Sequence, residues 1–186
     1  MPPEHERDED LMAQVAADRA DRLAPLVRRH ATGLLTFLTR MAGDSHRAEE
    51  LFQEVFLTVW LKRAQYQYPR PFRPWLYTIA LNRCRADFRV RKLPPAPAAE
   101  DAAGDDASPL DAAVSAEMAS FVSRAVTRLP ARQRAVVVLR VWHGLPYADI
   151  AEMVDCTEGT VRSHMHHALA SLRDELAPLF DDRVKR

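Results

Sequence analysis

The stretch LPARQRAVVVLRVWHGLPYADIAEMVDCTEGTVRSHMHHALASL, residues 129–172, has the pattern of two short helices joined by a tight turn. Apolar residues recur at helical spacing, with Ile150 before the turn and Val161 and Met165 after it. Thr157 is placed to cap the second helix with its side-chain oxygen. The pattern predicts a helix-turn-helix, in which the second helix enters the major groove of DNA. An ordinary helical hairpin that binds nothing has the same apolar spacing, because the motif is a signal of only a few residues.

Charge is strongly segregated along the 186 residues, although the formal net charge is zero. Residues 1–59 carry a net charge of −4, residues 60–92 carry +8, residues 93–120 carry −6 and the remainder carries +2. A concentrated basic segment is typical of a surface that binds a polyanion. We therefore expect residues 60–92 to contact nucleic acid.

The composition favours a cytoplasmic protein with packed cores. Apolar residues make up 47% of the chain, but the longest apolar runs are too short to cross a membrane. The acidic beginning of the chain lacks the basic and apolar regions of a signal peptide. The two cysteines, Cys84 and Cys156, provide neither a disulfide framework nor zinc spacing. We expect no membrane insertion, no metal and no cofactor.

Helical periodicity upstream predicts helices over residues 11–17, 23–41 and 47–63, with Gly43 ending one helix and Asp44 or Ser45 capping the next. The helix at residues 47–63 is apolar over a wide arc. Its other side carries Glu49, Glu50, Gln53 and Glu54. From these residues alone, a solvated acidic face is favoured over a docking surface.

Three prolines, Pro69, Pro71 and Pro74, predict an extended loop over residues 65–73, followed by a helix that opens at Trp75. Aromatic residues interleave with arginines here, namely Tyr66, Tyr68, Phe72, Trp75 and Tyr77 with Arg70, Arg73 and Arg83. Such a mixture suits unpaired bases, because a base stacks on an aromatic face while arginine binds its phosphates. The alternative is that the aromatic residues are core and the arginines solvated, and for Trp75 core packing is favoured.

Residues 93–113 contain four prolines and five acidic residues without an aromatic residue, and predict a flexible acidic linker. Helical patterns resume at residues 114–128 and 132–143. The fold class is therefore all-α, with two small helical domains, residues 1–92 and 114–186, on either side of the linker.

The two domains together resemble the extracytoplasmic-function (ECF) group of the bacterial sigma-70 family. Sigma region 2 is resembled by GDSHRAEELFQEVF (43–56) and FRPWLYTIALNR (72–83), and region 4 by LPARQRAVVVLR (129–140), GLPYADIAEMV (144–154) and EGTVRSHMHHALASLR (158–173). The resemblance implies a region 2 helical bundle followed by a region 4 helix-turn-helix. It also implies a protein that binds core RNA polymerase and directs promoter-specific transcription initiation, and that is not an enzyme.

The resemblance further implies three binding surfaces. The clamp helices of the largest polymerase subunit are expected at Glu49, Glu50, Leu51, Gln53, Glu54 and Phe56. The -10 element, opened with a flipped-out base, is expected at Tyr66, Tyr68, Arg70, Phe72, Arg73, Trp75, Asn82, Arg83, Arg85 and Arg89. The -35 element is expected at Thr160, Arg162, Ser163, His164, His166 and His167. The polymerase flap and an anti-sigma factor are expected as further partners.

Four positions depart from the family pattern. Asp155 stands where glycine is usual and where the turn needs a left-handed backbone, which aspartate tolerates better than most residues. Pro146 replaces the common serine cap of the helix before the turn. His164 and His167 stand where arginine is favoured. Because neutral histidine offers one donor in place of a bidentate fork, we predict weaker and more pH-dependent binding to the -35 element.

Two other functions are compatible with parts of the sequence. A two-domain regulator with a similar helix-turn-helix would bind duplex DNA as a dimer, but it would need an α/β sensory domain, and no alternating strand pattern is present. A metal-dependent enzyme would use the cluster His164, His166 and His167, together with Cys156. His164 and His167 are three residues apart and could share a helical face, but no carboxylate or third ligand with a recognised spacing accompanies them.

Overall fold

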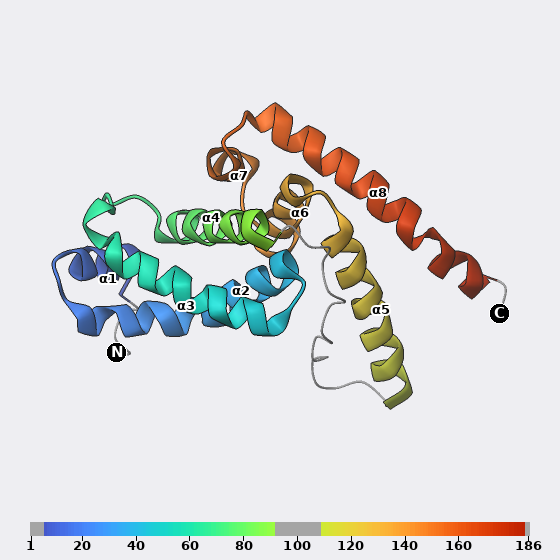
Figure 1. Cartoon of the computed structure of the whole chain (residues 1–186), viewed down its shortest axis with the longest axis horizontal. Helices are drawn as coiled ribbons and strands as arrows, with labels where there is room; N and C mark the ends of the chain where they lie inside the picture. The colour runs from blue at the N-terminus through green and yellow to red at the C-terminus, as the bar shows by residue number, and fades with distance from the viewer. Residues whose placement is uncertain (1–5, 92–108, 185–186) are drawn as a thin grey trace. The chain divides into compact units, whose positions relative to one another are not determined.

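The computed structural model describes residues 6–91 and 109–184, and within these ranges it is helical without a strand (Figure 1). The described residues form two compact units, one with residues 6–38 and 48–91 and the other with residues 39–47 and 109–184. The all-α prediction is confirmed. Most of the predicted acidic linker lies outside the described residues.

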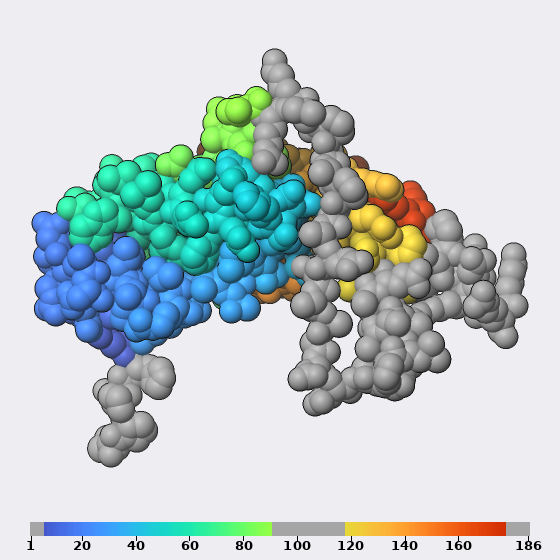
Figure 2. Space-filling model, turned by 60° about the horizontal axis from the view of Figure 1, so that its bottom comes forward, coloured from blue at the N-terminus to red at the C-terminus, as the bar shows by residue number. Residues whose placement is uncertain are grey.

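The amino-terminal half of the chain folds into α1 (Asp8–Ala16), α2 (Leu23–Ala42), α3 (Ser45–Leu61) and α4 (Phe72–Arg91), with short 3-10 turns η1 (Ala20–Arg22) and η2 (Arg63–Gln65). The break between α2 and α3 follows the sequence pattern. Gly43 has a φ of 73°, and Asp44 caps α3 by accepting the backbone N–H of Arg47 at 2.7 Å. Figure 2 shows α2 and α3 side by side on one face of the first unit.

The α4 helix begins at Phe72, earlier than the predicted start at Trp75. Pro74 was expected to keep the chain extended, but a proline in the first turn of a helix loses no internal hydrogen bond. The irregular loop therefore covers only residues 66–71.

The core of the first unit is formed by apolar faces of all four helices. Its fully or nearly fully buried residues include Leu11, Met12 and Val15 of α1, Leu26, Leu34, Phe37 and Leu38 of α2, Leu51, Val55 and Val59 of α3, and Phe72, Leu76, Ala80 and Leu81 of α4. Burial of each large apolar side chain contributes about 1.5–3 kcal/mol. The packing fixes α3 and α4, which carry two of the three predicted surfaces.

The carboxy-terminal half folds into α5 (Pro109–Arg128), α6 (Ala131–Val137), a π-helical segment η3 (Val138–Trp142), α7 (Tyr147–Val154) and α8 (Glu158–Val184). The α5 helix begins at Pro109, inside the predicted linker, because proline is well suited to the first position of a helix.

The helix-turn-helix of the second unit consists of α7 and α8. Ile150 of α7 and Val161 and Met165 of α8 are buried between them, as their spacing predicts. Asp155 adopts the left-handed conformation, with φ 55° and ψ 61°. Thr157 Oγ1 accepts the backbone N–H of Thr160 at 3.2 Å and so caps α8.

Candidate functional site

The predicted docking face on α3 is a row of exposed polar residues. Glu49, Glu50 and Gln53 are exposed, and Glu54 is half-buried. Leu51 and Phe56, predicted for the same surface, are only 1% and 7% exposed. These two side chains pack into the core and hold α3 in place, so the accessible part of this face is its carboxylates and Gln53.

Two apolar residues that were not predicted for this face extend it. Leu57 is 59% exposed and Leu61 is 65% exposed, which is unusual for large apolar side chains. With Glu49 and Gln53 they follow the i, i+4 spacing of one helical stripe. That spacing is readable in the sequence, but the apolar arc of α3 is so wide that the buried side could not be told from the exposed one.

The predicted -10 surface contains a cluster of aromatic rings at the start of α4. Tyr66 and Phe72 are buried, and the half-buried Trp75 packs against them with ring centroids 5.3 and 6.1 Å away. The Tyr66 hydroxyl donates to the backbone carbonyl of Arg70 across the loop. Burial, together with the nearby carboxylates of α1, raises the pKa of Tyr66 to about 12, so this hydroxyl stays protonated as a donor.

The exposed part of the loop is Tyr68 and its cationic neighbours. Tyr68 is 53% exposed, and Arg70, Arg73 and Arg89 are also exposed. Asn82 is exposed and accepts an N–H of the half-buried Arg85 at 3.4 Å. An exposed aromatic ring among arginines can stack on a base while the cations bind phosphates.

The guanidinium of Arg83, one of the predicted DNA-binding arginines, is directed at α3. Its Nε and Nη2 donate to Thr58 Oγ1 at 3.0 and 2.7 Å, and Nη1 lies 3.9 Å from a carboxylate oxygen of Glu54. Thr58 Oγ1 in turn donates to the Glu54 carbonyl at 2.6 Å. Arg83 therefore joins α4 to the helix of the docking face.

The predicted -35 surface is the outer face of α8. Its members Thr160, Arg162, Ser163, His166 and His167 are exposed, and His164 is half-buried. Arg162 pairs with Glu158 one turn earlier and lies over the ring of Tyr147, 4.6 Å from its centroid. The rings of His166 and His167 meet edge to face at 5.8 Å.

Two further properties bear on the class of site. In the ranges 6–91 and 109–184, no cluster of three or more metal-ligating side chains is present. Within the same part of the chain, none of the helices combines the length and the apolar character needed to span a bilayer.

Two family models match the chain in succession. The description "Sigma-70 region 2" matches residues 26–93, and "Sigma-70, region 4" matches residues 122–172. The first match covers most of α2, all of α3 and α4, and the second covers the helix-turn-helix.

Curated relatives match over almost the full chain. The RNA polymerase sigma-H factor of Pseudomonas aeruginosa is 31% identical over 187 residues, covering 94% of this chain and 96% of the relative. The ECF RNA polymerase sigma factor SigM of Mycobacterium tuberculosis is 34% identical over 171 residues, covering 90% and 84%. The ECF factor SigW of Bacillus subtilis is 29% identical over 178 residues, covering 89% and 95%.

Solved structures with the same fold include two complexes. The structure of CnrH with the cytosolic domain of CnrY has a TM-score of 0.69 at 24% identity, covering 93% of this chain and 99% of the solved chain. The sigma factor RpoE with the anti-sigma factor NepR, from Bartonella quintana, has a TM-score of 0.70 at 21% identity, covering 83% and 96%. At these identities the likeness concerns the fold.

Proposed function

The chain belongs to the ECF group of sigma-70 factors, transcription initiation factors that act with RNA polymerase on promoter DNA, and from this we propose how its surfaces divide that work. The observation that carries the proposal is the order of two surfaces along one chain. A basic helix with an exposed aromatic loop comes first, and a helix-turn-helix follows. The two-domain regulator and the metal enzyme do not account for the region 2 match.

We propose that the exposed stripe of α3 binds the clamp helices of the largest polymerase subunit. Glu49, Glu50 and Gln53 would supply the polar contacts, and Leu57 and Leu61 the apolar contacts. Interfaces commonly place apolar anchors inside a polar rim, and the stripe on α3 has both parts. The flap is the proposed partner of the second unit.

We propose that the loop at residues 66–71 and the face of α4 separate the strands at the -10 element. Tyr68 would stack on an unpaired base, while Arg70, Arg73 and Arg89 neutralise phosphates of the separated strand. The buried rings of Tyr66 and Phe72 would support the loop from beneath. Asn82 and Arg85 lie between Arg73 and Arg89 on the same helix.

We propose that α8 reads the -35 element in the major groove. Thr160, Ser163 and His167 occupy one side of the helix near its amino-terminal end, the end that usually reaches the bases in helix-turn-helix proteins. His164 and His166 would extend the contact, and Arg162 would bind a phosphate or a base edge beside Tyr147.

An anti-sigma factor is a further proposed partner. Its support is that the RpoE structure of the same fold is a complex with an anti-sigma factor. Such a partner would hold the protein in the cytoplasm away from polymerase, and the chain itself would have no catalytic activity. Isolation of the protein from unstressed native cells should yield this partner in equal amounts, whereas consistent isolation of the free protein or of polymerase holoenzyme would contradict the proposal.

Transcription with purified core polymerase tests the function directly. The full-length protein is added to core enzyme of the same organism on a pool of its genomic fragments, and transcript starts are sequenced. We expect a small set of start sites that share one -10 and one -35 motif and that are absent with core alone. Failure to bind core, or failure to direct initiation at any fragment, would refute the proposal.

A further inference from the structure

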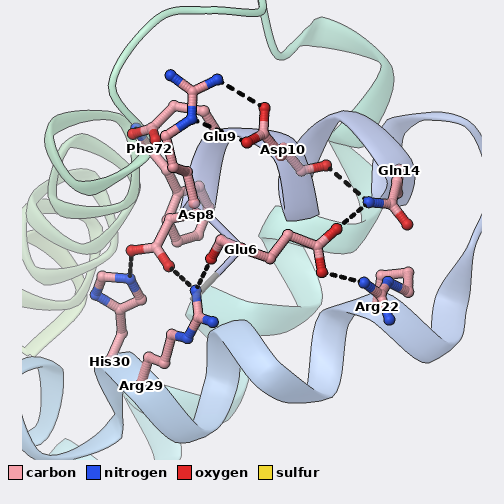
Figure 3. A network of polar contacts seen from close by, with 10 residues as sticks. Glu6, Asp8, Glu9, Asp10, Gln14, Arg22, Arg29, His30 and Phe72 are labelled. Atoms are coloured by element: carbon pink, nitrogen blue, oxygen red, sulfur yellow. Dashed lines mark hydrogen bonds and ion pairs between the residues drawn. The ribbon is translucent and has the colours of Figure 1, made fainter. Parts of the chain in front are cut away.

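Residues at the start of α1 and just before it contact the loop and the helix proposed to open the -10 element. Figure 3 shows this segment beside Phe72, the first residue of α4. This acidic segment, residues 6–10, lies before residue 26, where the region 2 match begins. None of the residues predicted to contact the promoter or the polymerase belongs to this segment.

Glu9 supplies the hydrogen-bond acceptor that the first turn of α4 lacks. The backbone N–H of Phe72, the first residue of α4, donates to Glu9 Oε1 at 3.1 Å. The first N–H groups of a helix have no partner within the helix, and Pro71 before it has no side-chain acceptor. Because Phe72 is completely buried, water is a poor substitute for the carboxylate.

Arg7 holds the exposed ring of the loop. Its Nη2 donates to the Tyr68 hydroxyl oxygen at 3.2 Å. The guanidinium is oriented by Asp10, which accepts from Nε and Nη2 at 2.9 Å each. The same segment that caps α4 therefore also fixes the direction of the aromatic ring proposed to stack on a base.

The segment is itself anchored to α2, so it can act as a fixed support. Asp8 accepts from Arg29 at 2.8 Å and lies 2.7 Å from His30 Nε2, and the His30 ring packs on Phe72 at 5.2 Å (Figure 3). Glu6 accepts from Gln14 and from Arg22. These partners, led by Gln14, hold the pKa of Glu6 below its ordinary value, which keeps this carboxylate charged near neutral pH.

We propose that Glu9 and Arg7 are positioning residues for promoter opening. Glu9 fixes the amino-terminal end of α4, and Arg7 fixes Tyr68, in the geometry that receives the flipped-out base of the -10 element. Both residues act through the loop and do not contact the base themselves. The inference rests on the proposed function of the loop and extends the -10 apparatus to α1.

The test uses full-length protein bound to core polymerase, on a promoter identified from the genomic pool and randomised at each -10 position. Open complexes are measured by permanganate reactivity of unpaired thymines, and base preference by sequencing of the transcripts. Glu9→Ala should lower the yield of open complexes about fivefold. A lost helix cap costs about 1 kcal/mol, which corresponds to about this change in an equilibrium constant. Glu9→Ala should also flatten the preference at the flipped-out position. Glu9→Gln keeps an oxygen that can accept the Phe72 N–H and should preserve both properties.

Matched controls separate positioning from charge and from stability. Asp21→Ala removes the same charge from an exposed residue paired with Arg19, and it should leave opening and base preference unchanged. Arg7→Ala changes an exposed side chain, so it should flatten the base preference without lowering the melting temperature. Arg19→Ala, its control at another exposed arginine, should leave the base preference unchanged. If Glu9→Ala unfolds the protein, the comparison of Arg7→Ala with Arg19→Ala tests the inference.

The outcomes distinguish this inference from the proposed function. Unchanged opening and preference in Glu9→Ala, or an equal loss at all -10 sequences with the preference intact, would overturn the inference, as would an unchanged preference in Arg7→Ala. Failure of the unmodified protein to bind core or to start transcription would instead remove the proposed function on which the inference depends.

Discussion

Arg83 shows how a single contact can reassign a residue. Its position in a basic series predicts phosphate binding, but two of its guanidinium nitrogens are occupied by one hydroxyl oxygen of Thr58. The free energy of such a bond to a charged group exceeds that of a neutral pair, so the guanidinium gains from keeping it. Arg83 thus links α4 to α3, the helix proposed to dock on polymerase.

Thr58→Val tests this link because valine keeps the shape of the buried side chain and removes the hydroxyl that accepts from Arg83 and donates to the Glu54 carbonyl. We expect the free energy of unfolding to fall by about 1 kcal/mol, since part of the guanidinium can still reach water. Urea denaturation of Thr58→Val, Arg83→Ala and the double variant measures the coupling. Strict additivity of the two single changes would contradict a direct interaction.

The histidines of α8 give a second prediction at the scale of single residues. We expect the combined changes His164→Arg and His167→Arg to tighten binding to the -35 element at neutral pH about tenfold or more, because each bidentate arginine contact is worth about 1–3 kcal/mol. Because histidine can take up a proton whereas arginine keeps a permanent charge, binding by the unmodified protein should depend more strongly on pH than binding by the variant. Fluorescence anisotropy of holoenzyme on -35 DNA measures both effects. No gain in affinity at neutral pH would refute the prediction.

The family resemblance predicts three surfaces, but the sequence alone does not separate their exposed residues from the buried residues that support them. Leu51, Phe56, Tyr66 and Phe72 were predicted to bind partners, and the structure places all four side chains in the core. An aromatic or apolar residue suits either place, and the choice depends on how neighbouring helices pack. The contacts of Glu9 and Arg7 join positions more than 60 residues apart, so no local pattern could indicate them.

At the scale of elements, the turn of the helix-turn-helix depends on Asp155. Its φ of 55° is a conformation that costs most residues about 1–2 kcal/mol, with aspartate among the less penalised types. Asp155→Gly should therefore raise the melting temperature of the second unit, and Asp155→Ala should lower it. Differential scanning calorimetry orders the three proteins, and an alanine variant as stable as the glycine variant would show that the left-handed turn is not strained.

Helix ends follow from capping chemistry more reliably than from breaker residues. Thr157 was predicted as a cap, and Asp44 and Ser45 were the two candidates for another. The structure shows that Thr157 and Asp44 each accept a backbone N–H group of the first turn. The prolines Pro74 and Pro109 were interpreted as parts of a loop and of a linker, but they lie in the first turns of α4 and α5. A proline fits that position as well as it fits an extended segment, so its presence alone does not tell a helix start from a loop.

At the scale of the whole molecule, segregation of charge suggests that polymerase binding and promoter binding can be separated. The exposed carboxylates of α3 lie in residues 1–59, which carry a net charge of −4. The exposed cations of the loop and α4 lie in residues 60–92, which carry a net charge of +8. The side chains of Glu49, Arg70 and Arg89 are exposed to solvent on these two surfaces. Each set is therefore available to a partner of the opposite charge.

Two charge changes test this separation. Glu49→Lys should weaken binding to core polymerase at least about tenfold, because a like charge at an interface costs more than a lost contact. Arg70→Ala with Arg89→Ala should leave core binding intact and weaken promoter binding, with the salt dependence of log K falling by about one for each lost phosphate contact. Asp174→Lys, at an exposed position of α8, controls for the charge reversal. Titration of core and of promoter DNA over a range of salt concentrations measures both effects, and loss of core binding in the arginine variant would show that the two surfaces are not independent.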